Sequence, residues 1–125
     1  TGGIMVKIFI LIIFLIAGCT GDTRNDIKNN KKLSFSSSRS ADDVSGCILD
    51  KLDFLIPEKL VTNNLVDGEG LEIYIGAIQF SRMKYFHRVE IKKNNSQSLI
   101  SYQRSETDFV PISEKEVLEI IKECK

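Results

Sequence analysis

The segment from Met5 to Cys19 constrains this chain most strongly, because it separates the N-terminus from the part that folds. One positive charge, Lys7, precedes ten consecutive apolar residues, Ile8–Ala17. A helix needs about 20 apolar residues to cross a bilayer, since each residue adds about 1.5 Å along a core roughly 30 Å thick. A run half that long is typical of the apolar region of an export signal. We therefore expect folding to begin after Cys19.

The end of this segment, Ile16-Ala17-Gly18-Cys19, resembles the lipobox of bacterial lipoproteins: an aliphatic residue, two small residues and a cysteine. The resemblance implies that the Cys19 sulfur receives a diacylglyceryl group and that cleavage before it makes Cys19 the new N-terminus. It also implies attachment to the membrane of the bacterial cell envelope. Thr20 after the cysteine favours the periplasmic face of the outer membrane over the inner membrane. The alternatives are a free-standing transmembrane helix or an ordinary secretory signal with an incidental cysteine.

Three regions are expected along the chain. Residues 1–18 form the signal peptide, in which 1–4 lie ahead of Met5 and are interpreted as an artefact. Residues 19–39 form the lipidated cysteine and a flexible tether, because Thr20–Ser38 is polar, charged and without hydrophobic periodicity. Residues 40–125 form one small globular domain.

The charge balance argues against a nucleic-acid partner. Without Lys7, the remaining chain carries 16 basic and 17 acidic residues. A strong nucleic-acid binder is expected to be clearly basic. An export signal points away from the same partner, so none is expected.

The cysteine count predicts a disulfide. With Cys19 assigned to lipid, Cys47 and Cys124 remain as an even pair in an exported chain, where disulfides persist. Each cysteine also falls on the apolar stripe of a predicted helix, which would bring the pair within bonding reach. The alternatives are two free thiols or a metal pair, but two cysteines with one distant histidine make a poor metal site.

Helices are expected at both ends of the domain. Ser40 and Ser113 are predicted N-caps, each with an acidic residue three positions on. The first helix is expected to end before Pro57 and the second to reach Cys124. Strands are expected at Leu60–Thr62, Leu71–Phe80, Lys84–Lys93 and Leu99–Gln103, with turns at Asn63-Asn64, Asp67–Gly70 and Asn94–Ser96.

The predicted fold class is therefore α+β, with the order α-β(3–4)-α. An antiparallel sheet carries both terminal helices on one face, and the disulfide joins them. This pattern over Ser40–Lys125 resembles small uncharacterised envelope lipoproteins with an early helix like Ser40–Lys51 and a C-terminal helix ending in cysteine. That resemblance implies a fold and a location, and no activity.

No catalytic, metal-binding or cofactor-binding constellation is found in the sequence. His87 is the only histidine, and the alternation of its strand places it on one face with Tyr85 and Val89. It is expected to be a structural, hydrogen-bonded side chain. The alternative is a small hydrolase or ligand-binding enzyme acting on cell-wall material, which would gather His87 with Asp67 or Glu69 in a cleft.

One strand carries a basic stripe. The candidate surface for an anionic partner consists of Arg82, Lys84, Phe86, Arg88 and Lys92. Such a surface would meet lipid headgroups, an anionic envelope polymer or an acidic envelope protein. The alternative is an ordinary solvated sheet face. The leading interpretation of the whole chain is a non-enzymatic, membrane-anchored interaction or inhibitor module.

Overall fold

The computed structural model describes residues 23–55, 60–79, 81–106 and 112–125. The helices are α2 (Arg24–Lys28), α3 (Ala41–Leu55), the 3-10 turn η1 (Val66–Gly68) and α4 (Glu114–Cys124). The strands are β1 (Leu33–Ser37), β2 (Leu60–Asn64), β3 (Gly70–Gln79), β4 (Arg82–Asn94) and β5 (Gln97–Arg104).

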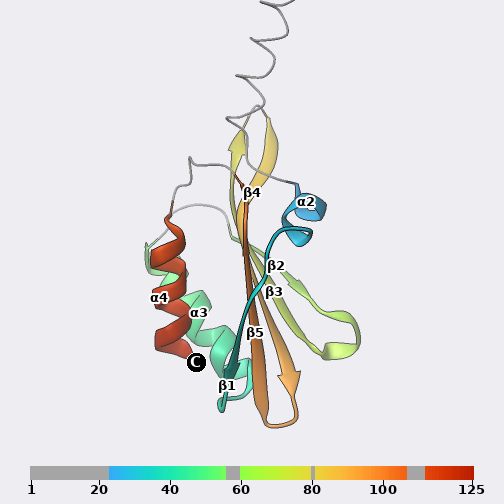
Figure 1. Ribbon diagram of the computed structural model, residues 1–125, viewed down its shortest axis with the longest axis vertical. Coiled ribbons are helices and arrows are strands. Elements are labelled where there is room, and N and C mark those ends of the chain that lie inside the picture. The colour runs from blue at the N-terminus through green and yellow to red at the C-terminus, as the bar shows by residue number, and fades with distance from the viewer. Residues whose placement is uncertain (1–22, 56–59, 80, 107–111) are drawn as a thin grey trace, which may run out of the picture.

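The described strands form one antiparallel sheet in the order β1-β5-β4-β3-β2. Helices α3 and α4 lie side by side against one face, and the short α2 lies against the other (Figure 1). The predicted α+β class, with two terminal helices on one face of an antiparallel sheet, is confirmed. The described sheet has five strands, where three or four were expected.

Local capping signals fix where the two long helices begin. The Ser40 hydroxyl accepts a hydrogen bond from the Asp43 amide at 3.1 Å, and the Ser113 hydroxyl accepts one from the Glu116 amide at 3.2 Å. Each bond satisfies an amide that has no partner inside its helix. Both predicted N-caps are confirmed.

The main core fills the space between the sheet and the helices α3 and α4. Helix α3 buries residues at a spacing of four, Val44, Ile48 and Leu52, which is one face of a helix. Helix α4 and strands β3, β4 and β5 supply most of the rest of this core, including Val117, Ile120, Ile121, Ile73, Ile75, Val89, Ile91, Ile100 and Tyr102.

The segment expected to be a flexible tether is folded from residue 23 onward, so that prediction was wrong there. Strand β1 pairs along the sheet edge with β5, from Leu33 opposite Tyr102 to Ser37 opposite Ser98. Helix α2 buries Ile27 against the outer face of the sheet. These tertiary contacts supply the stabilisation that the polar sequence alone lacks. The turn predicted at Asn63-Asn64 is also wrong, since both residues belong to β2.

A bulge in β4 breaks the alternation assumed from the sequence. Ile75 lies opposite His87, but the next residue, Gly76, lies opposite Tyr85, so Phe86 is the extra residue. Tyr85 therefore faces α2, whereas His87 faces α3 and α4, and the prediction that they share a face was wrong. A Cβ atom at Gly76 would lie 2.2 Å from the Lys84 carbonyl oxygen, so the close approach of the two strands requires glycine there.

Candidate functional site

A disulfide ties the two terminal helices together. Cys47 of α3 and Cys124 of α4 are bonded, with their Cα atoms 5.7 Å apart. The predicted pairing is confirmed. The Cys124 carbonyl also accepts a hydrogen bond from the Arg39 guanidinium at 2.8 Å, which joins α4 to the segment after β1. The helices therefore present a fixed surface.

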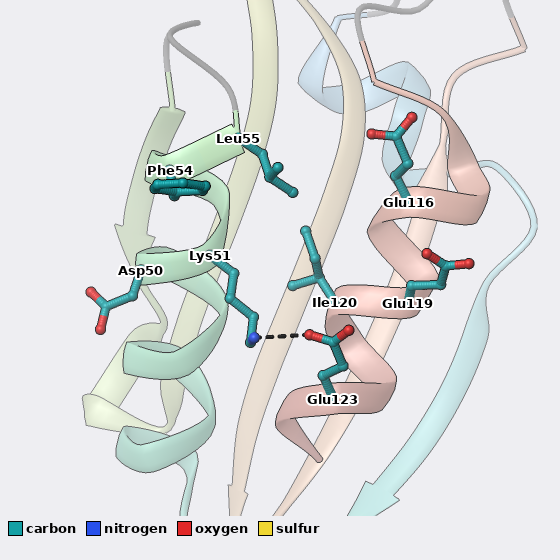
Figure 2. A pocket seen from close by; sticks show the side chains of 8 residues that line it. All are labelled: Asp50, Lys51, Phe54, Leu55, Glu116, Glu119, Ile120 and Glu123. Atoms are coloured by element: carbon teal, nitrogen blue, oxygen red, sulfur yellow. Dashed lines mark ion pairs between the residues drawn. The ribbon is translucent and has the colours of Figure 1, made fainter.

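An open groove of about 530 Å³ lies between α3 and α4, toward the C-terminal end of α3. Figure 2 shows Leu55 and Ile120 pointing toward each other across it, and Lys51 reaching from α3 to Glu123 of α4. The Lys51 Nζ and Glu123 Oε2 atoms are 2.8 Å apart. This volume is within the range of about 300–1,000 Å³ that is usual for ligand sites.

The groove combines exposed apolar side chains with negative charge. Phe54 is 89% exposed and Leu55 is 51% exposed. The same groove is lined by four carboxylates and one ammonium group: Asp50, Glu116, Glu119, Glu123 and Lys51. An exposed aromatic residue within an acidic rim favours a ligand that carries both an apolar group and positive charge.

The sequence analysis missed this groove, although a signal for it was present. The buried stripe of α3 runs through Val44, Ile48 and Leu52. Phe54 comes two residues after Leu52, which places it on the opposite side of the helix. A large aromatic residue on the solvent side of an amphipathic helix is the pattern that could have identified the site.

The predicted basic stripe is not a continuous surface. Phe86 and Arg88 are buried, Lys84 is half-buried, and Arg82 and Lys92 are exposed at opposite ends of β4. The prediction that all five form one surface was therefore wrong. The bulge and the packing of α2 on this side of the sheet account for the difference.

Arg88 is the centre of an internal ion-pair network. Its guanidinium donates to Glu72 Oε2 at 2.7 and 2.9 Å, to Glu90 Oε2 at 2.5 Å and to Gln103 Oε1 at 2.8 Å. Gln103 in turn donates to the carbonyls of Lys28 and Asn30 at 2.8 and 2.9 Å. The network therefore fastens the end of α2 to the sheet.

The network also controls the ionisation of Glu72. Burial alone would raise the pKa of this carboxyl group, but hydrogen bonds from Arg88 and Tyr74 and the nearby positive charges lower it. Glu72 and Glu90 lie directly opposite each other on β3 and β4. Arg88 contacts both carboxylates and neutralises most of this like-charged pair, and the Lys28 ammonium lies 3.8 Å from Glu72.

His87 is a buried structural residue. Its Nε2 lies 2.7 Å from the Ile112 carbonyl, so Nε2 carries the proton and donates it to that oxygen. Its Nδ1 then accepts a hydrogen bond from the Tyr102 hydroxyl at 2.5 Å. Burial lowers the pKa of His87 to about 4, and the charge of Arg104 acts in the same direction. The ring is therefore neutral at physiological pH.

His87 and Glu69 are not brought together. Glu69 is exposed after η1, next to the end of β4 where its carbonyl accepts a hydrogen bond from the Lys93 amide. His87 lies in the middle of β4 with both ring nitrogens engaged. The side chain of Asp67 and the lipobox residues with Cys19 lie outside the described part of the chain. The geometry gives the hydrolase alternative no support from His87.

We expect the stability of the protein to fall as the pH decreases from about 6.5 to 4. The unfolded chain protonates His87 near pH 6.5, whereas the folded chain does so only near 4. The unfolded state therefore binds more protons in this window, and the free energy of unfolding should fall by about 2 kcal/mol between pH 7 and pH 5. Urea unfolding at the two pH values measures this loss.

Because the sequence contains one histidine, its NMR signal gives the folded-state pKa directly. The variant His87→Gln should be less stable at pH 7, since its amide fits the two hydrogen bonds imperfectly, but its stability should stay nearly constant between pH 7 and pH 5. An imidazole that titrates near its usual pKa of about 6.5 would contradict the burial argument.

The comparisons with known proteins identify no relative: no protein-family model, curated protein or solved structure matches this chain. None of the helices in the described ranges is both long and apolar enough to cross a membrane. Within the same residues, no group of three or more His, Cys, Asp or Glu side chains could hold a metal ion.

Proposed function

We propose that the protein is a lipid-anchored module of the bacterial cell envelope that binds or inhibits a cationic envelope protein through the α3–α4 groove, without enzymatic activity. The observation that carries this proposal is the exposure of Phe54 beside the acidic rim of the groove. The proposed anchor is Cys19, at the periplasmic face of the outer membrane.

The envelope location is supported by two independent features. The short apolar run that ends in Ile16-Ala17-Gly18-Cys19 fits a lipoprotein signal. The bond between Cys47 and Cys124 fits an oxidising compartment, since disulfides are rare in reducing cytosol. Intact mass of the protein recovered from membranes tests the anchor: we expect cleavage before Cys19 and a diacylglyceryl addition on it. An unmodified Cys19 would rule the anchor out.

The binding role is supported by the character of the groove. Exposed apolar side chains next to fixed charges are typical of protein interaction sites, in which a central aromatic residue carries much of the affinity. The disulfide holds the two walls together, so little conformational freedom is lost on binding. The acidic rim selects a partner with clustered Lys or Arg around an apolar side chain.

The variant Phe54→Ser should weaken partner binding by roughly thirtyfold, since an interface centre of this kind contributes about 2 kcal/mol or more. The folded domain should change in stability by no more than about 0.5 kcal/mol, because Phe54 is exposed. The partner is first identified by photo-crosslinking from position 54 in living cells, and its affinity is then measured by calorimetry with the purified protein.

Two controls separate the groove from general surface effects. Leu99→Ser removes another exposed apolar residue, on β5, and should leave affinity unchanged. Glu119→Lys reverses one charge at the rim and should weaken binding more at low salt than at high salt. Equal affinity of Phe54→Ser and the unaltered protein would count against the groove as the binding site.

A further inference from the structure

The tip of the β3–β4 hairpin has a surface chemistry opposite to that of the groove. Ile78 is 64% exposed, Arg82 is exposed and Lys84 is half-buried. Between Glu72 and Glu90 the sequence contains no acidic residue. An exposed aliphatic side chain with neighbouring cations fits a surface that is anionic outside and apolar beneath, which describes a membrane interface.

The strand register places these groups around the end of the hairpin. Ile78 lies opposite Met83, and Ala77 lies opposite Lys84. Directly opposed residues share a face of the sheet. Ile78 is therefore on the face that carries α2, and Lys84 is on the other face. A flat surface that meets the hairpin end-on would touch both kinds of side chain.

The first described residues are fixed against the same hairpin. Thr23 caps α2 by accepting a hydrogen bond from the Asp26 amide. The guanidinium of Arg24 lies 5.3 Å from the ring centres of both Tyr74 and Tyr85 and donates to the Tyr85 hydroxyl at 3.3 Å. In Figure 1 the start of α2 and the hairpin tip lie toward the same end of the molecule.

Chain length then limits how far the domain can stand from the proposed anchor. Cys19 precedes Thr23 by four residues, which span at most about 14 Å. From Tyr85, which Arg24 contacts, the hairpin continues for three residues to Arg82, or about 10 Å. The hairpin therefore extends nearly as far as the chain to Cys19 can reach, and its tip lies within reach of the bilayer that holds the anchor.

We propose that the hairpin tip, formed by Ile78, Arg82 and Lys84, contacts anionic lipid headgroups of the membrane in which Cys19 is anchored. Ile78 enters the boundary between headgroups and acyl chains, and the two cations bind lipid phosphates. This inference rests on the proposed lipid anchor. The contact orients the domain, so that the α3–α4 groove is presented at a fixed angle to the membrane.

The absence of tryptophan from the sequence provides a selective probe. The full chain carrying Ile78→Trp is purified from membranes and reconstituted into vesicles of phosphatidylcholine with and without phosphatidylglycerol. The matched control is Val66→Trp, because Val66 is 81% exposed and lies beyond the other end of the ten-residue strand β3. Melting temperature and intact mass confirm that both variants fold and retain the disulfide.

We expect the fluorescence of the tryptophan at position 78 to shift to shorter wavelength in phosphatidylglycerol vesicles and to be quenched by brominated lipid. The tryptophan at position 66 should show neither effect. If Cys19 is lipidated but the two probes behave alike, the hairpin contact is wrong and the anchor stands. If position 78 is shielded only when an acidic protein is bound, the tip is a protein-binding surface and the membrane contact is wrong.

A second measurement tests the tip if Cys19 proves to be unmodified. All described elements lie after residue 22, so a chain that starts at position 19 and carries Cys19→Ser retains them. Its flotation with phosphatidylglycerol vesicles should weaken about fivefold for each of Arg82→Gln and Lys84→Gln. Lys93→Gln, at the far end of β4, removes the same charge and should have little effect. No flotation of the parent chain would overturn the proposal.

Discussion

Removing the disulfide, with Cys47→Ala and Cys124→Ala together, should lower the free energy of unfolding by about 4–5 kcal/mol. The bond closes a loop between residues separated by 77 positions, so its loss frees a large part of the unfolded chain. Domains of this size are stable by only about 5–15 kcal/mol in total. Guanidinium unfolding of the oxidised protein and of the double variant measures the difference.

The proposed effect of the disulfide on the unfolded chain can be tested separately from the size of the stability loss. If the bond acts on the unfolded state, the double variant should expose more surface on unfolding, and the denaturant slope m should increase. Cys47→Ala alone leaves the buried Cys124 as a free thiol and preserves its packing, so its stability should be close to that of the double variant. A loss below about 1 kcal/mol in both would show that the chain-entropy account fails here.

Replacing the internal cation, with Arg88→Met, should destabilise the protein by about 3–5 kcal/mol at pH 7. The side chain of Arg88 is 6% exposed and holds Glu72 and Glu90 between their strands. Its removal leaves two opposed carboxylates with only the half-exposed Lys28 ammonium, 3.8 Å from Glu72, as a countercharge. Circular dichroism melting and urea unfolding measure the loss.

The effect of Arg88→Met should depend on pH in a defined direction. In the unaltered protein the lowered pKa of Glu72 contributes stability above about pH 4.5, and this contribution is lost as the pH falls through the folded-state value. In the variant, protonation relieves the repulsion between the two carboxylates. The difference between the two proteins should therefore shrink below pH 4.5.

Two further variants separate charge from packing. Adding Glu72→Gln and Glu90→Gln to Arg88→Met removes the repulsion and should recover much of the lost stability. Arg82→Met removes an exposed arginine from the same strand and should cost no more than about 0.5 kcal/mol. A loss for Arg88→Met that is the same at every pH would contradict the electrostatic explanation.

The parts of the fold that could be predicted are those with local signals. Ser40 and Ser113 predict the starts of their helices, because a capping hydroxyl bonds an amide within the first turn of the helix. The cysteine pairing was predicted from the two cysteines that remain after Cys19 and from their places on the apolar stripes of the two helices. In contrast, Leu33–Ser37 alternates apolar and polar side chains over only five residues, and its pairing with β5 depends on residues far along the chain.

The surface chemistry was less predictable for two reasons. The extra residue Phe86 reverses the faces on which Tyr85 and Lys84 lie, and α2 covers part of a face that was expected to be solvated. The alternation of β4 assigned Arg88 to a solvated face, but α2 and the opposing acids enclose it. The local signal for the bulge is Gly76 on the opposing strand, and nothing at Phe86 itself marks it. The groove at Phe54 depends on how α3 and α4 pack together. The disulfide that fixes this packing was predicted, but the groove that it leaves between the two helices was not.

The long-range connections of this fold set the order in which it can form. The edge strand β1 cannot pair until β5 is present, and α3 cannot pack against α4 until the strands between them are present. In an exported chain the Cys47 thiol has no partner until Cys124, 77 positions later, reaches the same oxidising compartment. The domain therefore passes through a stage in which the apolar side of α3 is uncovered and accessible to chaperones and proteases.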